Sequence, residues 1–122
     1  MSNADTEVGE LLPLTPAMFH ILLSLAGGPA HGYAIMLEIS RLTAGAVQLG
    51  PGTLYRTIQK LLDERLIEED GADDDERRVP YRMTARGTKV ARAEAARLAV
   101  LVKIAQRRGL LGTAAAHRGA TA

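Results

Sequence analysis

The order of the periodic segments along the chain constrains the fold most strongly. Three consecutive segments carry apolar residues at helical spacing, two short segments have strand character, and one long helical segment follows. Their approximate ranges are 15–26, 31–42, 51–64, 66–70, 77–84 and 86–108. This order predicts a mainly α protein with a small β-hairpin, namely a winged helix-turn-helix domain followed by a long C-terminal helix.

Composition narrows the function classes. The chain of 122 residues suits one domain with short tails, and its aromatic content is only 3%. The absence of cysteine excludes disulfides and thiolate metal sites, and the histidines share no metal-binding spacing. No catalytic grouping, signal peptide or membrane-spanning run is evident. We therefore expect a cytoplasmic protein that is not an enzyme and uses no metal or cofactor.

Charge is distributed unevenly along the chain. The net charge is only +1, but acidic side chains dominate residues 63–76 and basic ones dominate from residue 77 onward. A basic half is one way to bind a polyanion such as DNA. The same pattern also fits a solvated helix surface, so charge alone leaves both interpretations open.

The segment 51–64 combines an apolar stripe with a polar outer face. Leu54, Ile58 and Leu61 converge on one side at 100° per residue, together with Leu62. The opposite side offers cations, an amide, hydroxyls and an aromatic ring, which can pair with base edges or phosphates. These side chains are Thr53, Tyr55, Arg56, Gln59 and Lys60. The alternative is an ordinary amphipathic helix whose polar face is merely solvated.

Three motifs in order resemble the PadR family of transcriptional regulators. They are ILLSLAGGPAHGYAI (21–35), GPGTLYRTIQKLLDERLI (50–67) and YRMTARGTKV (81–90). The resemblance implies a homodimeric winged-helix protein that binds double-stranded DNA, usually as a repressor, and has no enzymatic activity. By position, Thr53 and Tyr55 would touch DNA while Leu54 packs inward.

Two residues depart from the family pattern. Arg56 stands where family members often have proline, which adds a cation to the outer face. Arg65 stands where they usually have glycine, often with a positive φ. We therefore expect this turn to be made differently or to be mildly strained.

The predicted hairpin has an acidic tip. Residues 73–76 would repel a phosphate backbone, so we expect the tip to point away from DNA or to be disordered. Arg77, Arg78 and Arg82 on the returning strand would then make the minor-groove or phosphate contacts. The acids lack the order of ligands of an EF-hand, so a solvated loop is the preferred interpretation.

The last helical segment is apolar on more than one side, which predicts a second partner. Every position from Leu98 to Val102 is apolar, and a two-fold homodimer is the simplest way to cover the extra face. The expected interface residues are Met18, Phe19, Leu22, Leu98, Leu101, Val102 and Ile104. The resemblance also implies release from DNA by a small-molecule effector. Met18 and Phe19 could line an aliphatic pocket for it, although plain interface core is the simpler interpretation.

These expectations divide the chain and leave alternatives. The ranges are a flexible N-terminal tail at 1–12, the DNA-binding domain at 13–85, a dimerisation helix at 86–109 and a disordered tail at 110–122. The leading hypothesis is a dimeric regulator on an inverted-repeat operator. A winged-helix protein-interaction module and a small-molecule sensor without sequence-specific DNA binding are the alternatives.

Overall fold

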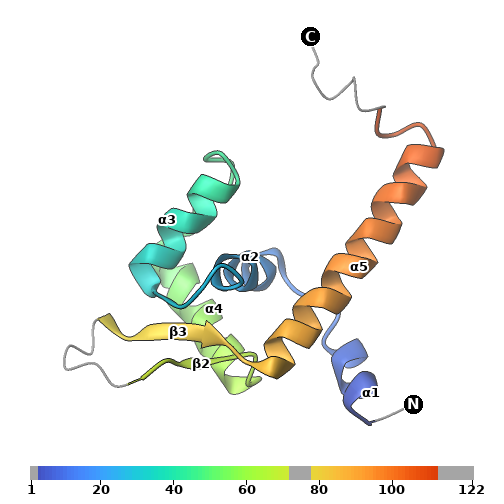
Figure 1. Cartoon of the computed structure of the whole chain (residues 1–122). Coiled ribbons are helices and arrows are strands. Elements are labelled where there is room, and N and C mark those ends of the chain that lie inside the picture. Colours follow the sequence, from blue (N-terminus) through green and yellow to red (C-terminus); the bar gives the residue numbers. More distant parts are fainter. Residues whose placement is uncertain (1–2, 72–77, 113–122) are drawn as a thin grey trace.

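The computed structural model describes residues 3–71 and 78–112 (Figure 1). Figure 1 shows α2, α3 and α4 gathered together, with the β2–β3 hairpin projecting to one side and α5 running away on the other. The elements are α1 (Asn3–Glu10), α2 (Pro16–Leu25), β1 (Ala30–His31), α3 (Gly32–Leu42), α4 (Pro51–Asp63), β2 (Ile67–Glu69), β3 (Pro80–Met83) and α5 (Ala85–Arg107). The predicted order of helices, hairpin and long helix is confirmed.

The first predicted helix begins and packs as its sequence indicates. Thr15 caps α2 by accepting a hydrogen bond from the Met18 N–H at 3.2 Å, and Pro16 occupies the first turn. Ile21 and Leu22 are fully buried. They belong to one core cluster to which α3, α4, β2 and α5 also contribute. Its most buried members are Ile21, Leu22, Ile35, Ile39, Leu54, Ile58, Leu61, Leu66, Ile67 and Val90.

The sheet has one more strand than the predicted hairpin. In the described part of the chain, β1 pairs antiparallel with β3, and β3 pairs antiparallel with β2. β3 is therefore the central strand of this sheet. Pro80 is its first residue, a position where the missing N–H is tolerated. A strand of two residues, Ala30–His31, is too short to show a period in sequence.

The expectation of a flexible tail at residues 1–12 is corrected. Residues Asn3–Glu10 form α1, which packs against α5 and buries Val8. The chain then passes through Leu14, which is also buried. So short a helix is unstable alone and depends on such tertiary contacts, which its polar sequence does not reveal. The tail predicted at 110–122 lies mostly outside the described residues.

The first half of α5 packs on the core, whereas the second half extends beyond it and is exposed. Gly87, Val90 and Glu94 are buried, whereas Val100, Leu101, Val102 and Ile104 are all 40% exposed or more. Figure 1 shows this second half projecting beyond the rest of the domain. Within residues 3–71 and 78–112, no helix is both long and apolar enough to cross a bilayer.

Candidate nucleic-acid interface

Helix α4 turns its apolar stripe inward and its polar side outward. Leu54, Ile58 and Leu61 are buried in the core, as predicted, and Leu62 is half-buried. The side chains of Tyr55, Arg56, Gln59 and Lys60 are exposed, and that of Thr53 is half-buried. The N-cap residue of α4 is Gly50, which has no side chain, so no side-chain cap satisfies the first backbone N–H groups of this helix.

Two polar residues on this face have partners on the same helix. Gln59 Nε2 donates to Asp63 Oδ1 at 2.9 Å. Arg56 Nη2 lies 3.5 Å from Thr53 Oγ1, which is a weak contact. Gln59 would therefore have to break its hydrogen bond to Asp63 before it could bind a base. Arg56 would lose only its weak contact with Thr53.

Tyr55 contacts helix α3 as well as solvent. Its phenol ring lies directly over Gly32, and a Cβ at that position would clash with the ring. Tyr55 is still 48% exposed, so one side of the ring remains open. The neighbouring Tyr81 has a raised pKa because of burial first, and then because of Glu69 and Tyr55. The contact between Gly32 and Tyr55 was not predicted from the sequence. Gly32 belongs to the first family motif, but no local pattern indicates that a residue of α4 packs on it.

Arg82, one of the three arginines predicted to contact DNA from the hairpin, forms ion pairs within that hairpin. Arg82 Nη2 lies 2.5 Å from Glu68 Oε2, and its Nε lies 3.5 Å from Asp70 Oδ1. Arg78 is exposed. Arg77 and the acidic tip at 73–76 lie outside the described residues. The predicted phosphate contact of Arg82 would thus have to compete with two carboxylates.

The residues predicted for a dimer interface fall into two groups. Leu101, Val102 and Ile104 are exposed on α5, and Leu98 is half-buried. Met18 is only 5% exposed and Leu22 is fully buried within the same chain, so both already pack in its own core. They lie on the core side of α2, and the two apolar flanks of that helix could not be distinguished in sequence.

Phe19 instead lines an apolar groove between α2 and α5. The groove has a volume of about 390 Å³. Its other lining residues are Leu22, Leu23, Ala26, Met83, Thr88, Ala91, Arg92 and Ala95. Leu23 is 44% exposed and Val100 on α5 is 56% exposed, and neither was among the predicted interface residues. Both lie in runs of consecutive apolar residues, where the sequence alone does not indicate which side chains are exposed.

The turn after α4 has a left-handed residue. Arg65 has φ of 61°, which is one of the two outcomes expected from its place in the family pattern. Its N–H donates to the Leu62 carbonyl at 3.0 Å, and the Leu66 N–H donates to the Leu61 carbonyl at 2.9 Å. This pair of bonds is a Schellman motif, which normally has glycine at the position of Arg65.

Comparisons with known proteins assign the chain to a family. The transcriptional regulator PadR-like family matches residues 21–93. A 37.1 kDa protein of transposon Tn4556 from Streptomyces fradiae is 35% identical over 88 residues, which cover 70% of this chain but 24% of that protein. The chain thus spans about a quarter of that relative's length.

Solved structures agree on the fold. A transcriptional regulator from Clostridium thermocellum is 24% identical, with a TM-score of 0.66 over 74% of this chain and 89% of that one. A PadR family regulator from Clostridium difficile is 17% identical, with a TM-score of 0.64 over 76% of this chain and 97% of that one. The protein therefore belongs to the PadR-like family of transcriptional regulators.

Proposed function

We propose that this chain is a homodimeric repressor that reads an inverted-repeat operator through α4. The observation that carries the proposal is the outer face of α4, where Arg56 and Lys60 lie exposed on the side opposite its buried apolar residues. Arginine and lysine can pair with guanine edges or with phosphates. The protein would place the first turns of α4 in the major groove, as recognition helices do.

Backbone groups support the same orientation. The N-terminus of α4 has no side-chain cap, and the positive end of a helix dipole favours phosphate. Thr53 and Tyr55 stand in the first turns and would contact the sugar-phosphate backbone. Because Tyr55 also rests on Gly32, its ring would reach the DNA from a position fixed by α3.

The dimer would form through the exposed second half of α5. Leu101, Val102 and Ile104 present apolar surface that the chain's own core leaves open. The groove beside Phe19 and Leu23 offers further apolar surface for a second copy. In a two-fold dimer the two copies of α4 would lie about 34 Å apart, one turn of DNA.

Repression and effector release are the finer parts of the proposal. A domain that occupies a promoter blocks transcription by that binding alone, and the family resemblance favours this sign of regulation. A small apolar effector would fit the groove between α2 and α5, where Phe19 supplies the aromatic surface. Effector binding there would compete with, or rearrange, the second copy.

The test is selection of bound sequences from a random duplex pool at two salt concentrations. We expect enrichment of an inverted repeat with half-sites about one turn apart, and binding that weakens steeply with salt. Replacing both Arg56 and Lys60 by alanine should lower affinity for the enriched site about 10- to 100-fold. Replacing Arg107 and Arg108 by alanine removes the same charge at the C-terminal end of α5 and should have a much smaller effect.

A protein-interaction module is the second candidate, and the pairing of Arg82 with wing acids favours it. Such a module would show no enrichment at either salt concentration. The double alanine variant of Arg56 and Lys60 would then leave DNA binding unchanged at its weak, nonspecific level. If a sequence is enriched, a reporter gene placed downstream of it would distinguish repression from activation.

A further inference from the structure

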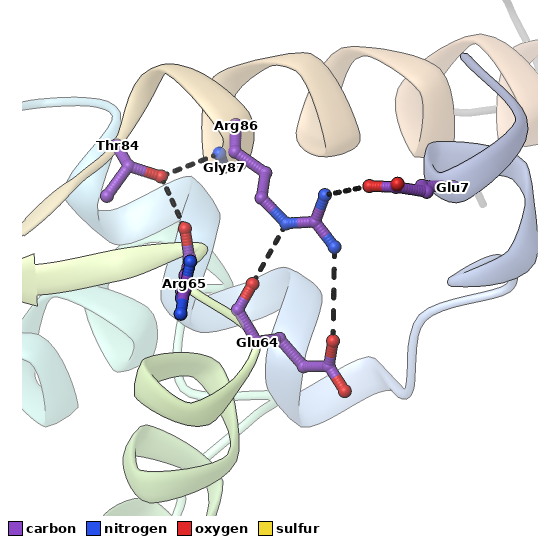
Figure 2. Close-up of polar contacts among 6 residues, drawn as sticks. All are labelled: Glu7, Glu64, Arg65, Thr84, Arg86 and Gly87. Atoms are coloured by element: carbon purple, nitrogen blue, oxygen red, sulfur yellow. Dashed lines mark hydrogen bonds and ion pairs between the residues drawn. The ribbon is translucent and has the colours of Figure 1, made fainter. Parts of the chain in front are cut away.

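Arg86 joins three helices at the point where α4 ends and α5 begins (Figure 2). Its Nε donates to the Glu64 carbonyl at 2.9 Å. Its Nη1 lies 3.3 Å from Glu7 Oε1 on α1, and its Nη2 lies 4.0 Å from Glu64 Oε1. One guanidinium therefore contacts the C-terminal cap of α4 and the helix α1 while belonging to the first turn of α5.

The backbones of these elements meet closely at the same point. Thr84 Oγ1 accepts from the Gly87 N–H at 2.9 Å, which caps α5, and donates to the Arg65 carbonyl at 2.7 Å (Figure 2). A Cβ on Gly87 would collide with the carbonyl of Leu66. The N-terminal turn of α5 is thus seated against the turn that follows α4, with no space for a larger residue.

We propose that Arg86 is a positioning residue that sets the orientation of the recognition helix α4 relative to the long helix α5. This inference rests on the proposed function, since the consequence for DNA is that the α4–α5 orientation fixes the distance between the two recognition helices of a dimer. A change of a few degrees at this junction is carried along α5 to the second copy. Arg86 would therefore determine which half-site spacing the dimer prefers.

The chemistry of arginine suits this role. The two forked nitrogens and Nε of a guanidinium can donate in separate directions, whereas a lysine ammonium acts as one point charge. A cation beside the last carbonyls of α4 is also favoured by the helix dipole. The carboxylates of Glu7 and Glu64 are each about half exposed, so the bond to the Glu64 carbonyl is the contact that specifies position.

The direct test is the distance between two spin labels in the free protein. The chain has no cysteine, so labels placed at Gln59→Cys on α4 and Lys103→Cys on α5 are unique. Dilution with unlabelled protein ensures that a dimer contains only one labelled chain. We expect Arg86→Met, which keeps the apolar stem, to broaden or shift the distance distribution. Arg86→Lys should restore it only in part.

Matched variants separate positioning from general damage. Arg107→Met makes the same substitution near the end of α5 and should leave the distribution unchanged. Glu7→Gln weakens only the ion pair between Arg86 and α1, so it should change the distance distribution less than Arg86→Met does. Circular dichroism establishes that each variant is folded. A distribution in folded Arg86→Met identical to that of the unsubstituted protein would overturn the proposal.

A second arm measures spacing preference on DNA. Inverted repeats whose half-sites are moved closer or apart by one and two base pairs are compared with an isolated half-site. Arg86→Met should reduce the preference for the best spacing about tenfold, as expected for one charge-assisted hydrogen bond, with isolated half-site affinity unchanged. Equal loss on both substrates would contradict a positioning role. If the unsubstituted protein binds no operator, the proposed function fails, while the distance measurement still decides the role of Arg86.

Discussion

The backbone N–H of Leu14 donates a hydrogen bond to Glu94 Oε2 at 3.3 Å, across a sequence separation of 80 residues. Glu94 is 2% exposed and also accepts two bonds from Arg97, at 2.7 and 3.0 Å. This single carboxylate joins the segment after α1 to the middle of α5. Among the described residues, Glu94 is the only buried charged side chain.

The pKa of Glu94 predicts acid sensitivity. The hydrogen bonds from Arg97 lower the pKa most; burial opposes them, and the charge of Arg97 and the Leu14 N–H add to the lowering. A lowered folded pKa means that the carboxylate contributes stability above the usual glutamate range, and this contribution is lost as pH falls through the folded pKa. Urea unfolding at a series of acidic pH values should show this decline.

Glu94→Gln is the control for that measurement. The amide can still accept from Leu14 but does not titrate in this range. The variant should be less stable than the unsubstituted protein near neutral pH and should lose less stability on acidification. Parallel pH curves for the two proteins would show that other carboxylates cause the decline.

Replacing Ser24 by alanine should stabilise the domain. Among the described residues, the buried Ser24 Oγ has no hydrogen-bond partner, and such a hydroxyl costs about 1–3 kcal/mol. We expect Ser24→Ala to raise the free energy of unfolding by about 1 kcal/mol. Ser40→Ala on α3 gains helix propensity without removing a fully buried hydroxyl, so its increase should be smaller. Equal gains in the two variants would point to propensity alone.

The left-handed Arg65 predicts a second stabilising substitution. A non-glycine residue in this region costs about 1–2 kcal/mol, and glycine removes that cost at some expense in chain entropy. Arg65→Gly should therefore raise the free energy of unfolding by about 0.5–1 kcal/mol. Arg65→Ala removes the same side chain but keeps the strain. A gain as large in Arg65→Ala would attribute the effect to the lost arginine.

The pairing of Arg82 predicts that wing acids oppose DNA binding. Glu68→Gln removes the 2.5 Å partner of Arg82 and should raise affinity for the selected operator several-fold. It should also steepen the salt dependence by up to about 0.9 in log–log slope, the value for one more phosphate contact. Glu69→Gln makes the same charge change at the next residue, which pairs with Tyr81 across the sheet. Identical effects of the two variants would indicate a general charge effect.

The sequence allowed the main architecture to be predicted because helical periods and turn residues are local signals. The apolar stripe of α4 and the cap of α2 are of this kind. The missed features depend on contacts between distant segments: β1 is ordered by pairing with β3, and α1 by packing on α5. Similarly, no local pattern tells that Arg82 faces Glu68 or that Leu22 faces the core, since both statements depend on how strands and helices pack.

The exposed second half of α5 predicts how the oligomer can be broken. Leu101 and Ile104 are 49% and 40% exposed in one chain, and we expect a second copy to bury them. Replacing both by aspartate would bury charge at that interface, which costs several kcal/mol and should yield monomers in analytical ultracentrifugation. Operator affinity should fall to that of a single half-site, while the circular dichroism spectrum stays helical.

Leu37 on α3 is the matched control for this prediction. It is 54% exposed, so Leu37→Asp adds charge to a similarly open apolar position outside α5. That variant should sediment like the unsubstituted protein. A monomer produced by Leu37→Asp and not by the α5 variant would place the interface on α3. Since α3 packs directly against α4, the second copy would then lie beside the recognition helix, and the spacing expected for the two half-sites would no longer hold.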